Sequence, residues 1–117
     1  MSQKELDDLD IARTARMSAL YDCLTSTRRC YVITLLEESD DEVVSVRALA
    51  QQIAAIEQNV QPDHATGKPY RSVYNSLVQT HLHVLEDLSI IEYQPDRKIV
   101  SVGDDLDDAL LLLRVLR

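Results

Sequence analysis

The chain has 117 residues, and its 20 acidic and 12 basic side chains give a formal net charge of -8. This length fits one domain whose core needs no disulfide or metal to hold it together. No segment approaches the roughly 20 apolar residues of a membrane span, and the acidic N-terminus lacks the apolar stretch of a signal peptide. The sequence therefore predicts a cytoplasmic protein without a membrane partner.

The charged and aromatic residues of the chain have an unusual composition. Aspartate outnumbers glutamate 13 to 7, arginine outnumbers lysine 9 to 3, and phenylalanine and tryptophan are absent. Short carboxylates hold water and cations well, and few lysines leave few apolar stems on the surface. We interpret this as a surface adapted to molar salt, in a halophilic archaeon or its virus. The alternative is an ordinary acidic protein that avoids non-specific contacts.

The first half of the chain predicts helices and one short strand. Residues 1–16 are charged and weakly periodic, which indicates a flexible arm that leads into a helix. A second helix is expected at 27–38, because apolar residues recur there at helical spacing. The β-branched run 43–46 favours a strand, and a third helix follows at 46–59.

The second half begins with a loop at 58–69, which is rich in proline, glycine and asparagine. One long helix is expected at 70–88, with four apolar residues within about 60° of one another on its inner face. These residues are Val73, Leu77, Val84 and Leu88.

Two short strands, 90–93 and 98–102, are joined by a turn with proline and aspartate, and an amphipathic helix is expected at 104–117. The order predicts a mainly α fold with a small antiparallel sheet (α+β). We expect a winged helix-turn-helix domain at 17–103 with an added N-terminal helix and a C-terminal dimerisation helix.

The expected last helix is apolar over more than half of its circumference, which indicates a second neighbour besides its own domain. We therefore predict a homodimer whose interface includes four leucines: Leu106, Leu110, Leu113 and Leu116. The alternative is a helix docked entirely on its own chain.

Three segments resemble archaeal winged-helix regulators: 26–36 (STRRCYVITLL), 44–50 (VSVRALA) and 73–93. The likeness is to a haloarchaeal winged helix-turn-helix family of unknown function, and it covers roughly residues 20–102. It implies a DNA-binding role in transcription regulation without a known target. The loop after the third helix is longer than the 3 to 4 residues of a compact helix-turn-helix, so the groove geometry stays open.

The helix at 70–88 has suitable chemistry for reading DNA. The side opposite its core face holds Arg71, Ser72, Asn75, Gln79, Leu82 and Glu86. Arginine, asparagine and glutamine carry paired groups that match base edges in the major groove. The 22 residues between Asp63 and Glu86 include no acid. We predict that this helix enters the major groove; the alternative is a polar face packed on a partner.

Phosphate contacts are expected from the helix start and from outside the helix. The hairpin at 93–98 would act as a wing, and two arginines begin the second predicted helix. The full predicted set is Lys68, Arg71, Ser72, Asn75, Gln79, Arg97, Lys98, Arg28 and Arg29. For the cations outside the long helix, the alternative is a surface ion pair that contributes little.

Nothing in the sequence favours catalysis or a metal. It has no glycine-rich phosphate loop and no Ser/His/Asp order, and His81 and His83 point about 200° apart on a helix. We predict no enzyme and no cofactor. The predicted function is a sequence-specific transcription regulator that binds double-stranded DNA as a homodimer. The alternative is a winged-helix protein–protein interaction module without DNA binding.

Overall fold

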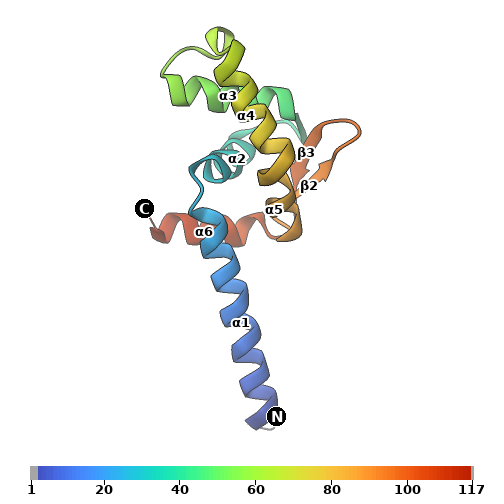
Figure 1. Ribbon diagram of the computed structural model, residues 1–117. Helices are drawn as coiled ribbons and strands as arrows, with labels where there is room; N and C mark the ends of the chain where they lie inside the picture. The colour runs from blue at the N-terminus through green and yellow to red at the C-terminus, as the bar shows by residue number, and fades with distance from the viewer. Residues whose placement is uncertain (1–2, 117) are drawn as a thin grey trace.

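The computed structural model describes residues 3–116, with side chains from residue 9 onward. Its elements in chain order are α1 (Gln3–Leu24), α2 (Thr27–Glu38), β1 (Val43–Ser45), α3 (Val46–Gln58), the 3-10 turn η1 (Pro62–His64), α4 (Gly67–Ser76), the π turn η2 (Leu77–His81), α5 (Leu82–Asp87), β2 (Ile91–Gln94), β3 (Ile99–Val102) and α6 (Leu106–Leu116). Figure 1 shows the small sheet at one side of the packed helices, and this arrangement confirms the predicted mainly α class with an antiparallel sheet.

The sheet joins two distant parts of the chain. Its strand order is β1-β3-β2 and both pairings are antiparallel, so β3 is the central strand. Val100 of β3 pairs with Val44 on one side and with Tyr93 on the other. Because Val100 and Tyr93 are buried, the sheet closes one side of the core and fixes the β2–β3 hairpin beside the helices.

Helix α3 lies at the centre of the core. Leu49, Ala50 and Ile53 are at most 1% exposed, and α3 packs against both α2 and α4. The Ser45 hydroxyl accepts a hydrogen bond from the Ala48 N–H at 3.0 Å, which caps the first turn of α3. The strand β1 therefore passes directly into a helix whose direction is fixed by its cap and its buried face.

Helix α1 projects from the rest of the molecule. The sequence predicted a flexible arm or the start of a helix for residues 1–16, and residues 3–16 are helical and continue into the packed part of α1. The molecule measures 59 × 31 × 26 Å, and the long dimension follows α1 (Figure 1). Residues 9–15 are all exposed, so only the C-terminal part of the helix packs on the domain.

A close approach of two backbone segments positions α6. A Cβ added at Gly103 would lie 2.3 Å from the Ser89 carbonyl oxygen, so this position admits only glycine without a backbone shift. The Gly103 N–H donates to the Ile90 oxygen and the Asp105 N–H donates to the Ser89 oxygen, each at 2.9 Å. Arg16 of α1 also binds Asp105 at 3.1 Å, so α1 and α6 meet at this junction.

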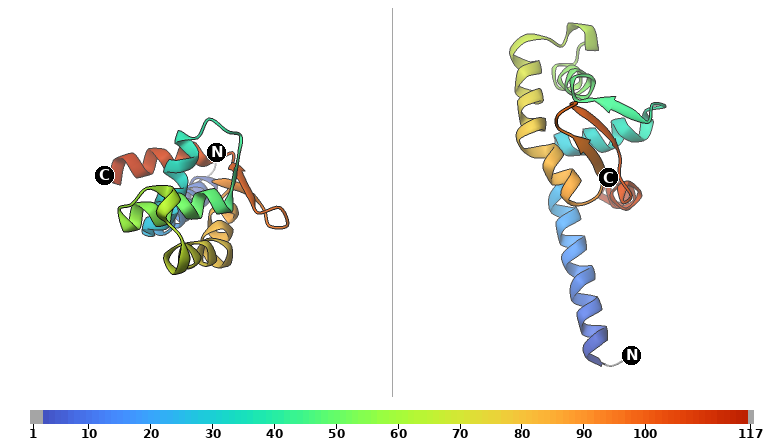
Figure 2. Two further views of the ribbon diagram at one scale, coloured as in Figure 1. Left: turned by 90° about the horizontal axis from the view of Figure 1, so that it is seen from above. Right: turned by 90° about the vertical axis from the view of Figure 1, so that its right-hand side faces the viewer.

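Figure 2 gives two further views of this arrangement, in which α6 crosses the base of the body and α1 leaves it. Within residues 3–116 no helix combines the length and apolarity that crossing a bilayer requires.

Candidate nucleic-acid interface

The outer side of α4 and η2 carries the polar residues that the sequence singled out. Arg71, Ser72 and Asn75 on α4 are exposed, and so is Gln79 in the π turn. Val73 and Leu77 on the inner side are fully buried against the core, which fixes the rotation of the helix. Arg71 and Asn75 therefore stand one helical turn apart on a surface open to a ligand.

The π turn corrects the predicted phase of the long helix. The sequence analysis assumed 100° per residue and placed Leu82 on the outer side, but Leu82 is 0% exposed. The Leu82 N–H donates to the Leu77 oxygen, an i→i+5 bond that fits one extra residue into the turn. Leu82 and Leu85 thus continue the buried side, while the predicted core residues Val84 and Leu88 are only partly buried.

A cleft runs from the sheet to α4. Its volume is about 400 Å³, and it is lined by Ser45, Arg47, Tyr70, Tyr74, Arg97 and Lys98. The Val46 N–H donates to the Lys98 oxygen at 2.9 Å, which holds the hairpin turn beside the start of α3. Lys98 has a φ of 54°, a left-handed conformation that suits the turn. The cleft thus brings together three elements that are distant in the sequence.

A second, smaller hollow of about 150 Å³ continues the cleft along the start of α4. It shares Arg47 and Tyr70 with the first, and its other lining residues are Gln51, Ala65, Thr66 and Gly67. The rings of Tyr70 and Tyr74 lie 6.0 Å apart and form the wall on the α4 side. The two hollows make one concave surface between the hairpin and α4.

Three cations line this concave surface: Arg47, Arg97 and Lys98. Two more, Lys68 and Arg71, follow the lining residues Gly67 and Tyr70 on α4, and we call the five together the basic strip. All five are exposed. Among the described side chains none of them has an acidic group within 4.0 Å, whereas the arginines on α1, α2 and α6 at positions 16, 28 and 114 are each paired. The strip is therefore a cationic region on a chain of net charge -8.

The sequence analysis missed Arg47. It lies in the first turn of α3, outside the segment that attracted attention by its lack of acids. Only the pairing of β1 with β3 brings this turn beside the hairpin. Local sequence carries no signal for that contact, because it depends on residues more than 50 positions apart.

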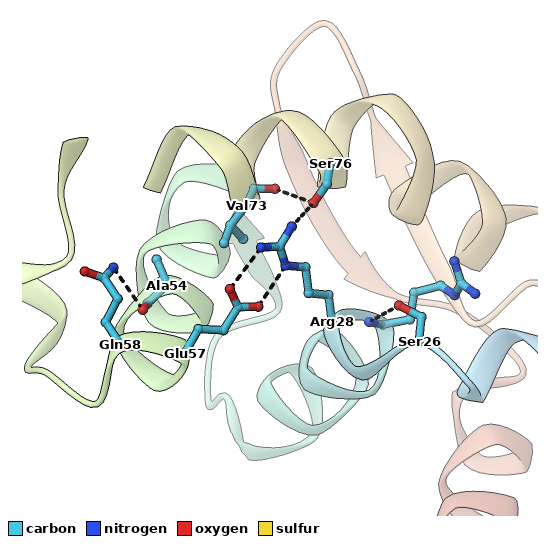
Figure 3. A network of polar contacts seen from close by, with 8 residues as sticks. Ser26, Arg28, Ala54, Glu57, Gln58, Val73 and Ser76 are labelled. Carbon is cyan, nitrogen blue, oxygen red and sulfur yellow. Dashed lines mark hydrogen bonds and ion pairs between the residues drawn. The ribbon is translucent and has the colours of Figure 1, made fainter. Parts of the chain in front are cut away.

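Arg28 makes its hydrogen bonds to side chains of its own domain. Its guanidinium donates to both oxygens of Glu57, at 2.8 and 2.9 Å, and to the Ser76 hydroxyl at 3.0 Å. Ser76 in turn donates to the Val73 oxygen at 3.0 Å, as Figure 3 shows. The hydrogen bonds that Arg28 donates to Glu57 raise the pKa of Arg28 above its usual value. Arg28 thus connects α2, α3 and α4, and its donors face the protein instead of a phosphate.

Arg29 is also engaged inside the chain. It donates to the carbonyl oxygens of Cys23 at 2.8 Å and Asp22 at 3.4 Å, in the last turn of α1. Its Nη1 lies 3.1 Å from His81 Nδ1, and because arginine can only donate, that nitrogen accepts. Burial, with Arg29 and Arg28 nearby, lowers the pKa of His81. Arg29, in α2, thus connects the end of α1 to the π turn.

The predicted dimer leucines lie elsewhere than expected. Leu106, Leu110 and Leu113 are buried within the chain itself, and of the four only Leu116 is exposed. A helix face cannot fill its own core and an interface at once. Contact between copies through α6 would therefore use Leu111, Val115 and Leu116, which are 60%, 78% and 48% exposed.

Among the residues whose side chains are described, no group of three or more His, Cys, Asp or Glu lies close enough to hold a metal ion. His64 lies 3.9 Å from Asp63 on the surface, and the ring of His83 meets the edge of Tyr93 at 5.7 Å.

The fold and cleft describe a small α+β domain with a basic concave surface beside an exposed helix. Residues 21–101 match a family described as a domain of unknown function (DUF7344), and the chain belongs to this family. The matched segment holds α2 to α5, the basic strip and nearly the whole sheet, and leaves out α6 and most of α1. No curated protein and no solved structure gives a significant match.

Proposed function

We propose that the protein is a sequence-specific, DNA-binding transcription regulator of a halophilic archaeon or its virus, and that it acts in the cytoplasm as a homodimer. In this proposal α2, α3 and α4 with the small sheet form a winged helix. Helix α4 and the π turn enter the major groove of double-stranded DNA, and the β2–β3 hairpin is the wing.

The element order supports the winged-helix assignment. A strand precedes α3, and a hairpin follows the long helix and pairs with that strand. The segment 59–66, with its single 3-10 turn, lengthens the connection between α3 and α4 beyond a compact helix-turn-helix. The composition, with aspartate and arginine in excess, supports the halophilic origin.

The basic strip is the observation that carries the proposal. Residues 64–85 include no acid in a chain that has 20 acidic residues. The five exposed cations of the strip have no acidic partner within 4.0 Å among the described side chains, which fits a polyanion. Molar salt reduces the Debye length to about 3 Å, so acids elsewhere on the molecule repel a phosphate only weakly. Binding there depends on direct contacts from this surface.

Two groups of residues have different roles in this proposal. Arg71 and Asn75 contact base edges, because their side chains offer paired donors and acceptors on the outer side of α4. Arg47, Arg97 and Lys98 line the cleft and contact phosphates, which positions the duplex without reading its sequence.

The test begins with selection of bound duplexes from a random library at high salt, followed by anisotropy titrations. Arg71→Ala and Asn75→Ala should each weaken the selected site by about 1–3 kcal/mol and relax its specificity. Arg47→Ala should weaken all duplexes similarly and reduce the salt slope by about 1. Arg114→Ala removes an arginine from α6, far from the strip, and should leave DNA affinity unchanged.

The proposal fails if the wild-type protein enriches no sequence, or if Arg71→Ala and Arg114→Ala bind equally well. A protein-interaction module is then the remaining candidate. One observation favours it: a groove of about 400 Å³ between α2, α3 and the following loop is lined by Leu35, Gln52, Ala55, Ile56, Asn59, Val60 and Pro62. Its exposed apolar side chains suit a protein partner better than DNA.

A further inference from the structure

A row of exposed side chains on α1, here called the α1 stripe, has no cover within the described chain. It consists of Asp10, Arg13, Met17 and Tyr21, which follow each other at spacings of three, four and four residues. At 100° per residue these positions share one face of the helix. Met17 and Tyr21 are 51% and 53% exposed, large fractions for apolar and aromatic side chains beside a packed core.

The projecting half of α1 lacks support from its own domain. Residues 9–15 are all exposed, and isolated helices of about 12 residues are only marginally stable in water. The α1 residues that pack on the domain, such as Leu20 and Cys23, belong to the C-terminal third of the helix. A second surface that covers the stripe would stabilise the projecting half.

The side chains of the α1 stripe change from acidic to basic to apolar from the N-terminal end of the helix toward the domain. The sequence has four acids in its first ten positions and arginines at 13 and 16. Arg16 is bound to Asp105, but within the described side chains Asp10 and Arg13 have no ion pair. The stripe therefore runs from acidic at the far end, through a cation, to apolar at the body.

We propose that the α1 stripe binds the same stripe of a second copy in antiparallel orientation. An antiparallel pair places Asp10 of each helix beside Arg13 of the other, so that paired positions add up to 23. A parallel pair would place Asp10 against Asp10 and Arg13 against Arg13, where like charges repel. The order of charges on the stripe thus favours a second copy of the same helix as the partner, in antiparallel orientation.

In this register the overlap of the two helices includes Met17, and Tyr21 lies just beyond its end. Residue 3 of one helix lies beside residue 20 of the other, which gives an overlap of about 18 residues, or about 27 Å. The far end of each helix then covers Met17 of its neighbour. The basic strip lies on the part of the body away from this half of α1, so both copies keep it open (Figure 1).

The exposed side of α6 is the competing surface. Leu111 and Val115 are exposed there, but Arg114, the cation of its last turn, already binds Glu37 at 2.9 Å. The α1 stripe offers complementary charges that have no ion pair in their own chain, and for that reason it is the stronger candidate.

Sedimentation equilibrium without DNA, in molar potassium chloride, tests the contact. Arg13→Glu and Asp10→Arg should each raise the dimer dissociation constant at least about tenfold, and an equimolar mixture of the two should restore the dimer. Each single variant also loses any Asp10–Arg13 contact within its own helix. Mixing the two variants cannot restore that contact, so a dimer that reappears on mixing reflects pairing between chains. Asp22→Arg lies about 140° from the stripe centre on the same helix and should leave the dissociation constant unchanged.

Cysteine cross-linking tests the orientation. Asp10→Cys mixed with Arg13→Cys should form a disulfide between chains under mild oxidation, whereas Asp10→Cys alone should not. The wild-type protein, with its native Cys23 and Cys30, gives the background.

Three results would overturn the inference: a wild-type chain that is monomeric at all concentrations, efficient cross-linking of Asp10→Cys with itself, or dissociation by Leu111→Ser with no effect of Arg13→Glu. These outcomes are separate from a failure of DNA binding, because the mass is measured without DNA. Arg71→Ala should change affinity for DNA and leave the mass unchanged.

Discussion

The two sides of the helix that runs from Gly67 to Asp87 differ in burial and in their hydrogen bonds. The inner side is buried at Val73, Leu77, Leu82 and Leu85, and it receives further hydrogen bonds from α2 through Ser76 and His81. The outer side presents Arg71, Asn75 and Gln79 to solvent, and no hydrogen bond or ion pair engages these side chains within residues 9–116. Stability should depend on the inner side and ligand binding on the outer side.

The largest expected effect on stability is at Leu82, which a regular α-helix with 100° per residue would place on the outer side. Because Leu82 is fully buried, Leu82→Ala should lower the free energy of unfolding by about 2–5 kcal/mol. Thr80→Ala in the same π turn is exposed and should change it by less than about 0.5 kcal/mol. Denaturation with urea measures both, and equal effects would show that the buried side does not follow the π turn.

A smaller effect is expected at Arg28, which binds the inner side from α2. Arg28→Ala leaves Glu57 and Ser76 without their charged donor and should lower the free energy of unfolding by about 1–3 kcal/mol. Arg97→Ala, an arginine of the basic strip, should change it by less than about 0.5 kcal/mol. If Arg97→Ala destabilises the protein as much as Arg28→Ala, the division between structural and available arginines is wrong.

The pH should affect the inner side through His81. The pKa of His81 in the folded protein lies below the ordinary 6.5, because of burial and the nearby arginines. As pH falls through that value the unfolded chain takes up the proton first, so the protein loses stability until the pH reaches the lower folded pKa. Urea denaturation between pH 7.5 and 5 should show this loss.

His81→Asn keeps an acceptor for Arg29 and removes the titrating ring, so it should flatten the pH dependence in that window. Thr80→Asn, an exposed position without a titrating group in the same π turn, provides the control and should keep the wild-type dependence. A wild-type slope in the His81→Asn variant would assign the titration to other groups.

The smallest effect on stability is expected on the outer side itself. Arg71→Ala and Asn75→Ala should each change the free energy of unfolding by less than about 0.5 kcal/mol, since both side chains are exposed and make no hydrogen bond or ion pair within residues 9–116. The same two variants are those expected to weaken DNA binding most. A large loss of stability would mean that the outer side also supports the fold.

Most element positions could be predicted from local sequence, because periodicity, caps and turn residues act over a few positions. The helix at 27–38 and the hairpin strands lie within two residues of their predicted places. The phase of the long helix could not be predicted, because a π turn has no local residue signature. Residues 3–16 of α1 form a helix although their sequence has almost no apolar periodicity.

The candidate site was predictable only in part. The polar types on α4 and the lack of acids around them are visible in the sequence, and those side chains are exposed as expected. The roles of Arg28 and Arg29 depend on Glu57 and His81, which are 29 and 52 positions away. The sequence of α6, which is apolar over more than half of the helix circumference, likewise does not indicate which side packs into the core of its own chain.

The π turn can also be described by its length, as one residue more than a regular helix requires. Leu77 and Leu82 pack as neighbours on the inner side although five positions separate them. Removing one residue from a buried helix ordinarily shifts every later side chain by about 100° and exposes the core. Here deletion of Thr80 would leave a regular i→i+4 spacing between the two leucines, so the domain should still fold. Only the outer surface around Gln79 would become shorter. The length of this helix can therefore change the outer surface without changing the core.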